Sequence, residues 1–202
     1  MEYFVFIPQL TRLFDVGKRV FLGFCLAVQA GSVLAQLPLG GIYSTAEDFE
    51  HDKFSFSYSC DSGKVKIRFN EFTDKPILII SRDKNYPFSK SEIFGLRDCA
   101  QRIFRIYKNE AYQLINQEAI WLYRQERLRN KSTEREQFHF FTSSVGGPLL
   151  PLTVAALKTA FSSNVAFLDL VNKYIHEDED LVKFDPLQKK FKVIQLFNQS
   201  YR

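Results

Sequence analysis

The spacing of apolar residues changes once along this chain, at Gly146-Gly147-Pro148, and that change constrains the fold more than any other feature. Before it, apolar and polar residues alternate with a period of two, which is typical of strands with one buried face. After it, apolar residues recur at helical spacing. Strands followed by helices predict an α+β fold. We expect an antiparallel β meander, folded as a sandwich or open barrel, followed by a C-terminal cluster of about three helices.

Two stretches before the change carry the clearest strand patterns. Apolar and polar residues alternate over 54–59 and over 65–69, on either side of a turn sequence at 61–63, which predicts a β-hairpin with one wet face. The run 77–80 is continuously apolar and predicts a strand covered on both faces. Further short strands are predicted at 103–107, 112–115, 120–123 and 138–141.

Turn-forming and charged residues separate these strands. Asn109-Glu110 predicts a turn between the first two, and 116–118 a turn before the next. The segment 124–137 is almost entirely charged or polar, so we expect an exposed loop or a long hairpin tip there.

Side chains that cap helices mark the expected helix starts. Ser44 and Thr45 each precede a carboxylate by three residues, which predicts a short helix over 45–50. In the C-terminal part, Asn164 is placed to cap the second of two helices. The acidic run 177–180 suits the start of a third. Asp185-Pro186 then predicts the start of the last helix, whose apolar stripe would be Leu187, Phe191, Ile194 and Phe197.

An apolar segment at 20–35 follows basic residues and ends in small ones, which is typical of a secretory signal peptide. We expect cleavage after Ala35. The chain would then comprise a signal peptide, 1–35, and a single globular domain, 36–202, that is β-rich over 42–145 and helical over 152–200. The alternative is an uncleaved anchor, because the segment is only slightly shorter than a membrane span.

Export bears on the cysteines. Cys60 and Cys99 remain after cleavage, and in an oxidising compartment they can form a disulfide. Two buried free thiols, behaving as small apolar side chains, are the other interpretation.

No residue pattern predicts catalysis or metal binding. The chain has 3 histidines, and none belongs to a nucleophilic triad motif. Glu47 and His51 would share a helix face, yet no third ligand accompanies them. The run 177–180 lacks the alternating ligands of a calcium loop. We therefore assign no catalytic residue, metal ligand or cofactor, and we favour a non-enzymatic role, with Glu47, Asp48, His51 and His139 as the acid or base candidates of an enzyme.

Basic residues interleaved with aromatic ones form the one candidate binding surface. Such a pattern can stack and neutralise an anionic ligand, although strands with one charged face produce it too. The residues of this predicted surface are Arg102, Arg105, Tyr107, Trp121, Tyr123 and Arg124. The net charge of +4 is too small to indicate nucleic acid.

Several short motifs resemble those of a group of small exported proteins of unknown function from Bacteroidetes-type bacteria. The motifs span most of the domain and are Gly41-Ile42-Tyr43, Glu47-Asp48-Phe49, Phe104-Arg105, Tyr112-Gln113-Leu114, Ile120-Trp121-Leu122-Tyr123 and Pro151-Leu152-Thr153, with the longer run 93–98. The resemblance implies a cell-envelope or secreted protein of a Gram-negative bacterium. It implies no active site.

These observations lead to one functional expectation and two alternatives. We expect an exported protein, in the periplasm, outer envelope or medium, that binds a protein or another envelope component without catalysis. The first alternative is a membrane-anchored envelope component that keeps its N-terminal segment. The second is an enzyme acting on an envelope polymer or peptide.

Overall fold

The computed structural model describes residues 38–60, 65–69, 74–81, 84–128 and 135–201. All of them belong to one compact unit, Gln36–Arg202. The predicted signal peptide, 1–35, lies outside the described residues.

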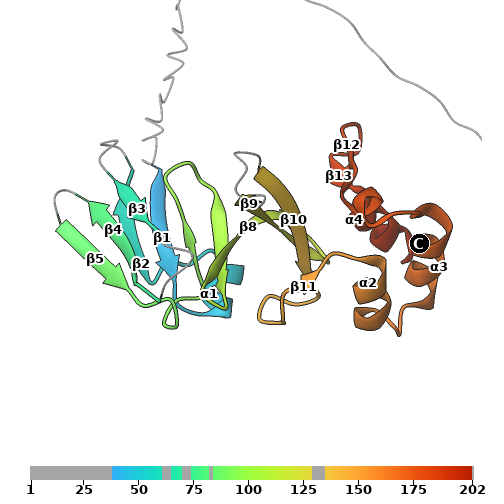
Figure 1. The fold of residues 1–202 in the computed structure, drawn as a ribbon, viewed down its shortest axis with the longest axis horizontal. Coiled ribbons are helices and arrows are strands. Elements are labelled where there is room, and N and C mark those ends of the chain that lie inside the picture. The colour runs from blue at the N-terminus through green and yellow to red at the C-terminus, as the bar shows by residue number, and fades with distance from the viewer. Residues whose placement is uncertain (1–37, 61–64, 70–73, 82–83, 129–134, 202) are drawn as a thin grey trace, which may run out of the picture. The chain divides into compact units, whose positions relative to one another are not determined.

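An open, antiparallel, eight-stranded sheet forms the centre of this unit (Figure 1). Its strand order is β11-β10-β9-β8-β7-β6-β1-β2, so β11 and β2 are free edges and the sheet is not a closed barrel. The strands are β1 (Leu39–Tyr43), β2 (Phe56–Ser59), β6 (Gly95–Arg97), β7 (Ile103–Tyr107), β8 (Glu110–Gln117), β9 (Trp121–Leu128), β10 (Arg135–Thr142) and β11 (Leu150–Pro151). With helices at the C-terminal end, the predicted α+β class is confirmed.

A second, three-stranded sheet has the order β3-β4-β5. Its strands are β3 (Lys66–Arg68), β4 (Ile77–Ser81) and β5 (Lys84–Phe88). The predicted strand at 77–80 is therefore present, with Ile77 and Ile79 fully buried. Pro87 lies on the edge strand β5, where a missing backbone N–H does no harm to the sheet.

The predicted hairpin over 54–69 is wrong. β2 pairs with β1, and β3 pairs with β4 in the other sheet. Both segments alternate as expected, but each finds its partner elsewhere in the chain. Alternation reports that one face of a strand is buried and carries no information on which strand lies beside it. The turn at 61–63 lies outside the described residues.

The meander of β7 to β10 follows the sequence closely. The strand predicted at 103–107 has the bounds of β7. The turn to β8 lies at Lys108 and Asn109, one residue earlier than predicted, and both have positive φ angles of 49° and 65°. Such angles define the two-residue turn that suits a right-twisted hairpin. The polar segment at 124–137 is a long hairpin, since β9 and β10 extend through most of it.

The short N-terminal helix α1 (Ala46–Glu50) confirms its prediction. Thr45, not Ser44, is the N-cap, and its hydroxyl accepts a hydrogen bond from the N–H of Asp48 at 3.0 Å. Phe49 is buried from this helix against β6. Gly95 of β6 makes room for it, because a Cβ there would lie 2.6 Å from the Phe49 ring.

The C-terminal helices are α2 (Val154–Ala160), α3 (Val165–Tyr174), the 3₁₀ helix η1 (Asp178–Val182) and α4 (Lys192–Gln199). Thr153 and Asn164 cap α2 and α3, accepting hydrogen bonds from Ala156 and Phe167 at 3.1 and 3.0 Å. The predicted cap at Asn164 is confirmed. None of the helices in the described ranges is both long and apolar enough to cross a membrane.

The predicted start of the last helix at Asp185-Pro186 is wrong. A small hairpin occupies this place, formed by β12 (Phe184–Asp185) and β13 (Lys190–Phe191), and α4 begins after it. The Asp185 carboxylate accepts hydrogen bonds from the N–H groups of Leu187 and Gln188, which closes a turn in place of a helix. Ile194 and Phe197 of the predicted stripe are buried, whereas Leu187 is exposed.

Three apolar cores hold these elements together. The helices cover one end of the large sheet around Leu122, Phe141 and Phe167. The three-stranded sheet covers the other end of the same face around Ile79, Leu96 and Ile106. On the opposite face, α1 and the segment 143–149 cover an aromatic core, whose buried members are Tyr43, Phe49, Tyr112, Trp121, Tyr123, Val145 and Leu149. Figure 1 shows the three-stranded sheet and the helices at opposite ends of the large sheet.

Candidate functional site

Between the two covered ends, one row of side chains crosses four strands of the large sheet. The register places Phe104 opposite Gln113, Gln113 opposite Arg124, and Arg124 opposite His139. Residues that are opposite one another in an antiparallel sheet point to the same face. The row therefore lies on the face that carries the helices at one end and the small sheet at the other.

A hollow of about 240 Å³ lies over this row. We call it the arginine hollow, and it is lined by Arg102, Phe104, Ala111, Gln113, Arg124, Gln125, Glu126 and Arg135. Its volume is below the roughly 300 to 1,000 Å³ of ordinary small-molecule pockets. The hollow therefore suits one or two side chains of a larger ligand better than a whole cofactor.

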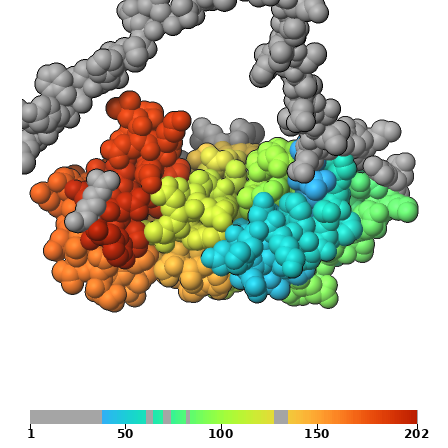
Figure 2. Space-filling view, turned by 180° about the vertical axis from the view of Figure 1, so that it is seen from behind, coloured from blue at the N-terminus to red at the C-terminus, as the bar shows by residue number. Residues whose placement is uncertain are grey.

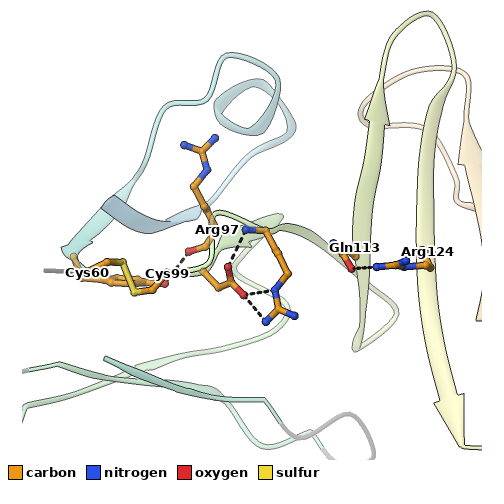
Figure 3. A network of polar contacts seen from close by, with 8 residues as sticks. Cys60, Arg97, Cys99, Gln113 and Arg124 are labelled. Carbon is orange, nitrogen blue, oxygen red and sulfur yellow. Dashed lines mark hydrogen bonds and ion pairs between the residues drawn. A yellow bond between two sulfur atoms is a disulfide. The ribbon is translucent and has the colours of Figure 1, made fainter. Parts of the chain in front are cut away.

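Arg124 is the central cation of the hollow. One of its terminal nitrogens, Nη2, donates to Oε1 of Gln113 at 2.9 Å, as Figure 3 shows. Its Nε is buried and has no acceptor in the described part of the chain. No carboxylate among the described residues forms an ion pair with it. A partly buried guanidinium with an unused donor is a favourable partner for an incoming anion.

The two other arginines of the hollow have acidic partners and are more exposed. Arg102 forms an ion pair with Asp98 at 2.7 Å, and its guanidinium lies 5.6 Å from the centre of the Phe104 ring. Arg135 contacts Glu126 at 3.2 Å. The Arg135–Glu126 pair is exposed on both sides, so it contributes less than about 1 kcal/mol and exchanges readily with solvent and ligands. Asp98 is buried and also accepts hydrogen bonds from the backbone N–H and the Nε of Arg102, so that pair is more firmly held. Positive charge therefore remains in excess around Arg124.

The positive charge of Arg124 affects the pKa of His139. It is half-buried on β10, and burial lowers the pKa of its imidazole, with the nearby Arg124 guanidinium lowering it further. Both effects disfavour the protonated ring. His139 lies beside Arg124 in the same row, so an anion bound at Arg124 would raise the pKa of His139.

The predicted binding surface does not exist as one surface. Arg102 and Arg124 line the hollow, but the other four residues lie on the opposite face of the sheet: Arg105, Tyr107, Trp121 and Tyr123. Successive side chains of a strand point to opposite faces. Arg102 and Arg105 are three residues apart, so one strand cannot present both on the same side. The same alternation separates Arg124 from Tyr123.

Arg105 belongs to the aromatic core and not to a binding surface. It is only 2% exposed, and its Nη2 donates to the carbonyl oxygen of Gly147 at 2.7 Å. Its guanidinium lies 4.8 Å from the ring centre of Phe94 and 5.3 Å from that of Tyr107. Burial raises the pKa of Tyr123 to about 12, although Arg105 opposes the rise. Cation–π contacts thus stabilise a charge that solvent does not reach.

The predicted disulfide is confirmed. Cys60 and Cys99 are bonded, with their Cα atoms 5.4 Å apart, as Figure 3 shows. The bond joins the ends of β2 and β6 across the start of β1, which lies between them. Close by, Arg97 donates to Asp52 at 2.6 Å, and its carbonyl accepts from Tyr58 at 2.8 Å.

The acid and base candidates do not meet. Glu47 and His51 are exposed on and beside α1, where the His51 ring contacts the carbonyl oxygen of Glu47 at 3.0 Å. His139, the other histidine among the candidates, lies on β10. Within the described ranges, no group of three or more His, Cys, Asp or Glu side chains could hold a metal ion.

The acidic run at 177–180 begins η1. Glu177 and Asp180 form a reciprocal capping box at its start. Lys183, together with the N–H groups of His176 and Glu177, holds the pKa of Asp180 well below its usual range. The predicted helix start is therefore present, and the helix ends at Val182.

No family model, curated protein or solved structure matches this chain.

Proposed function

We propose that this protein is an exported, non-enzymatic binding module that captures an acidic segment of a partner protein in the arginine hollow. The observation that carries the proposal is the state of Arg124. Arg124 lines the hollow and has a buried, unused Nε donor and no carboxylate partner among the described residues. A carboxylate from a ligand supplies the missing acceptor.

The surroundings of Arg124 favour a carboxylate over a neutral ligand. Arg135 can release the exposed Glu126 carboxylate and reach toward a second negative group. The small volume of the hollow accommodates an Asp or Glu side chain of an extended segment, with its neighbours passing along the sheet. Arginine is suited to this task because its planar guanidinium matches a carboxylate with two parallel hydrogen bonds.

A protein ligand fits better than an anionic polysaccharide. Sugar-binding sites use exposed aromatic rings as stacking platforms. Trp121, the only tryptophan, is buried on the other face of the sheet, and Phe104 is partly covered by Arg102. The hollow therefore offers charge and hydrogen bonds but no open ring face.

Three observations support the exported location. The Cys60–Cys99 disulfide is typical of an oxidising compartment. The apolar segment at 20–35 and the resemblance to exported envelope proteins point the same way. Sequencing the N-terminus of the native protein after cell fractionation tests this part, and we expect it to begin at Gln36 in an envelope or secreted fraction. An intact chain in the cytosol would contradict it.

A deca-glutamate peptide is a suitable probe of the hollow. We expect Arg124→Gln to weaken peptide binding by roughly tenfold to a hundredfold, which corresponds to one lost charge-assisted hydrogen bond. Lys158→Gln, which removes the same charge from the exposed face of α2, is the matched control and should leave binding unchanged. Fluorescence anisotropy of a labelled peptide measures both.

His139 provides a second, local readout. Its pKa, followed by NMR of the imidazole ring, should rise when the peptide binds, because the ligand neutralises Arg124. Equal peptide affinity in Arg124→Gln and the unaltered chain would contradict the proposal. Tighter binding of polygalacturonate than of the peptide would do so as well, and would identify an anionic glycan as the ligand.

A further inference from the structure

The small hairpin β12–β13 projects from the helical end of the molecule (Figures 1 and 2). Its turn is fixed by Asp185, whose Oδ1 accepts hydrogen bonds from the N–H groups of Leu187 and Gln188 at 2.8 and 3.1 Å. At its base, the rings of Phe184 and Phe191 are in edge contact, with their centres 5.3 Å apart. The hairpin is therefore an ordered structure and holds its tip in a defined position.

The hairpin carries two exposed apolar side chains, Leu187 at its tip and Phe184 at its base. Leu187 is 93% exposed and Phe184 is 53% exposed. Single exposed apolar residues are common on proteins, but two on one projecting hairpin form a patch that indicates an interaction. Because folding leaves these side chains exposed, burying them in an apolar phase would be favourable.

Five lysines belong to the hairpin and to the segments beside it. They lie in the hairpin, on its flanks and on the neighbouring helix α3: Lys173, Lys183, Lys189, Lys190 and Lys192. Two of them have acidic partners, since Lys183 pairs with Asp180 and Lys190 with Glu118. Lys173 and Lys192 instead lie over the ring of Tyr174, at 5.1 and 5.2 Å from its centre.

A shallow hollow of about 710 Å³ opens beside the hairpin, on the side of α4. Its lining combines two of these lysines with amide side chains and one aromatic ring: Tyr174, Gln188, Lys190, Lys192, Gln195, Leu196, Asn198 and Gln199. In a lipid monolayer, phosphate groups lie at the surface and acyl chains lie beneath them. Positive charge and hydrogen-bond donors would contact the phosphates, and an apolar tip next to them would contact the acyl chains.

We propose that the β12–β13 hairpin docks this protein on an anionic phospholipid bilayer. Leu187 and Phe184 enter the interface between headgroups and acyl chains, and the lysines contact the phosphates. The inference is independent of the arginine hollow, which lies on the sheet and shares no residue with the hairpin.

A bilayer fits this surface better than a partner protein. A stable protein interface usually buries more than about 1,000 Å², and a projecting tip of a few residues offers little of that area. A bilayer needs only a few inserted side chains together with nearby basic residues.

Leu187→Trp in the full-length chain reports insertion directly. Its emission should shift to the blue with vesicles of phosphatidylglycerol and phosphatidylcholine, and should not shift with phosphatidylcholine alone or with soluble glycerol 3-phosphate. The native Trp121 is buried and gives a constant background. Val165→Trp, at another exposed apolar position at the start of α3, is the matched control and should not respond.

Charge variants complete the test. Adding Lys189→Gln and Lys192→Gln to Leu187→Trp should weaken vesicle binding by about tenfold or more, as expected for two lost lysine–phosphate contacts. Arg124→Gln should leave the shift unchanged, which separates this proposal from the peptide-binding one. An absent shift with anionic vesicles, an equal shift with neutral ones, or a response only to added envelope protein would overturn the proposal.

Discussion

The two ends of the large sheet are stabilised by different means. At the end formed by β6, β1 and β2, the Cys60–Cys99 disulfide closes over a mixed aliphatic and aromatic core. At the other end, the helices are held by apolar packing, in which Phe161, Phe167 and Phe197 contact one another. No cysteine occurs in the helical part of the sequence. The stability of one end therefore depends on the redox environment, and the stability of the other does not.

The largest expected effect is at the helical end. Phe167 is fully buried and its ring centre lies 5.1 Å from that of Phe197. We expect Phe167→Ala to reduce the free energy of unfolding by about 4 to 5 kcal/mol, because the cavity cannot close between two fixed rings. Denaturant titration measures this loss. Val165→Ala on the exposed side of the same helix is the control, with an expected change below about 0.5 kcal/mol. Equal effects of the two substitutions would contradict this description of the core.

The next effect is at the disulfide end. Replacing Cys60 and Cys99 by serine opens a loop with a sequence separation of 39 residues. The chain-entropy model predicts a loss of about 3 to 4 kcal/mol. Hydrogen exchange should locate the loss, with faster exchange in β1, β2 and β6 and little change in α2 to α4. An increase of similar size in the helices would show that the two ends are not stabilised separately.

Two threonine helix caps, one on α1 and one on α2, allow the contribution of the same interaction to be compared in two parts of the molecule. Thr45 caps α1 and Thr153 caps α2, each through a side-chain oxygen that accepts from the third helical N–H. Thr45→Ala and Thr153→Ala should each cost about 1 kcal/mol. Thr159→Ala, in the last turn of α2, is the control and should be neutral or slightly stabilising. A large difference between the two caps would mean that one helix is held mainly by its packing.

The smallest effect concerns His139, which lies between the two ends. Its pKa is lowered in the folded state, so the unfolded chain binds the proton more readily. Stability should therefore be complete above the ordinary histidine value of about 6.5 and should fall as the pH decreases through that value. His139→Gln should flatten this part of the melting-temperature profile between about pH 7.5 and pH 5. An unchanged profile would contradict the assignment.

Local patterns predicted this fold well where a local cause decides the structure. The cap at Asn164 and the bounds of β7 depend on a few neighbouring residues, and both were predictable. The hairpin over 54–69 was not, because β2 and β3 are adjacent in sequence but pair with β1 and β4. The helical spacing of apolar residues around Leu187 predicted a helix start that is not there, because the Asp185 carboxylate closes a turn at this place.

The sequence predicts some residues of the candidate site and not others. Arg102 and Arg124 were identified as cationic candidates, and both line the hollow. Strand alternation would have removed Arg105 and Tyr123 from the same surface. Gln113 and Arg135 were missed, because only the pairing of β8, β9 and β10 brings them to Arg124. Register between strands is a property of the whole sheet, and no short motif encodes it.

The position of β1 has a consequence for the order in which an exported chain can fold. β1 is the first strand to emerge when a chain crosses a membrane N-terminus first, yet both of its neighbours, β2 and β6, follow it in the sequence. The edge of β1 that pairs with β6 has no partner strand until Arg97 has crossed. Likewise, Cys60 cannot form its disulfide until Cys99 has crossed. An open edge attracts other strands. In an exported chain, the speed of translocation and the local supply of chaperones and thiol oxidants would thus act on the same interval, between the passage of β1 and that of Cys99.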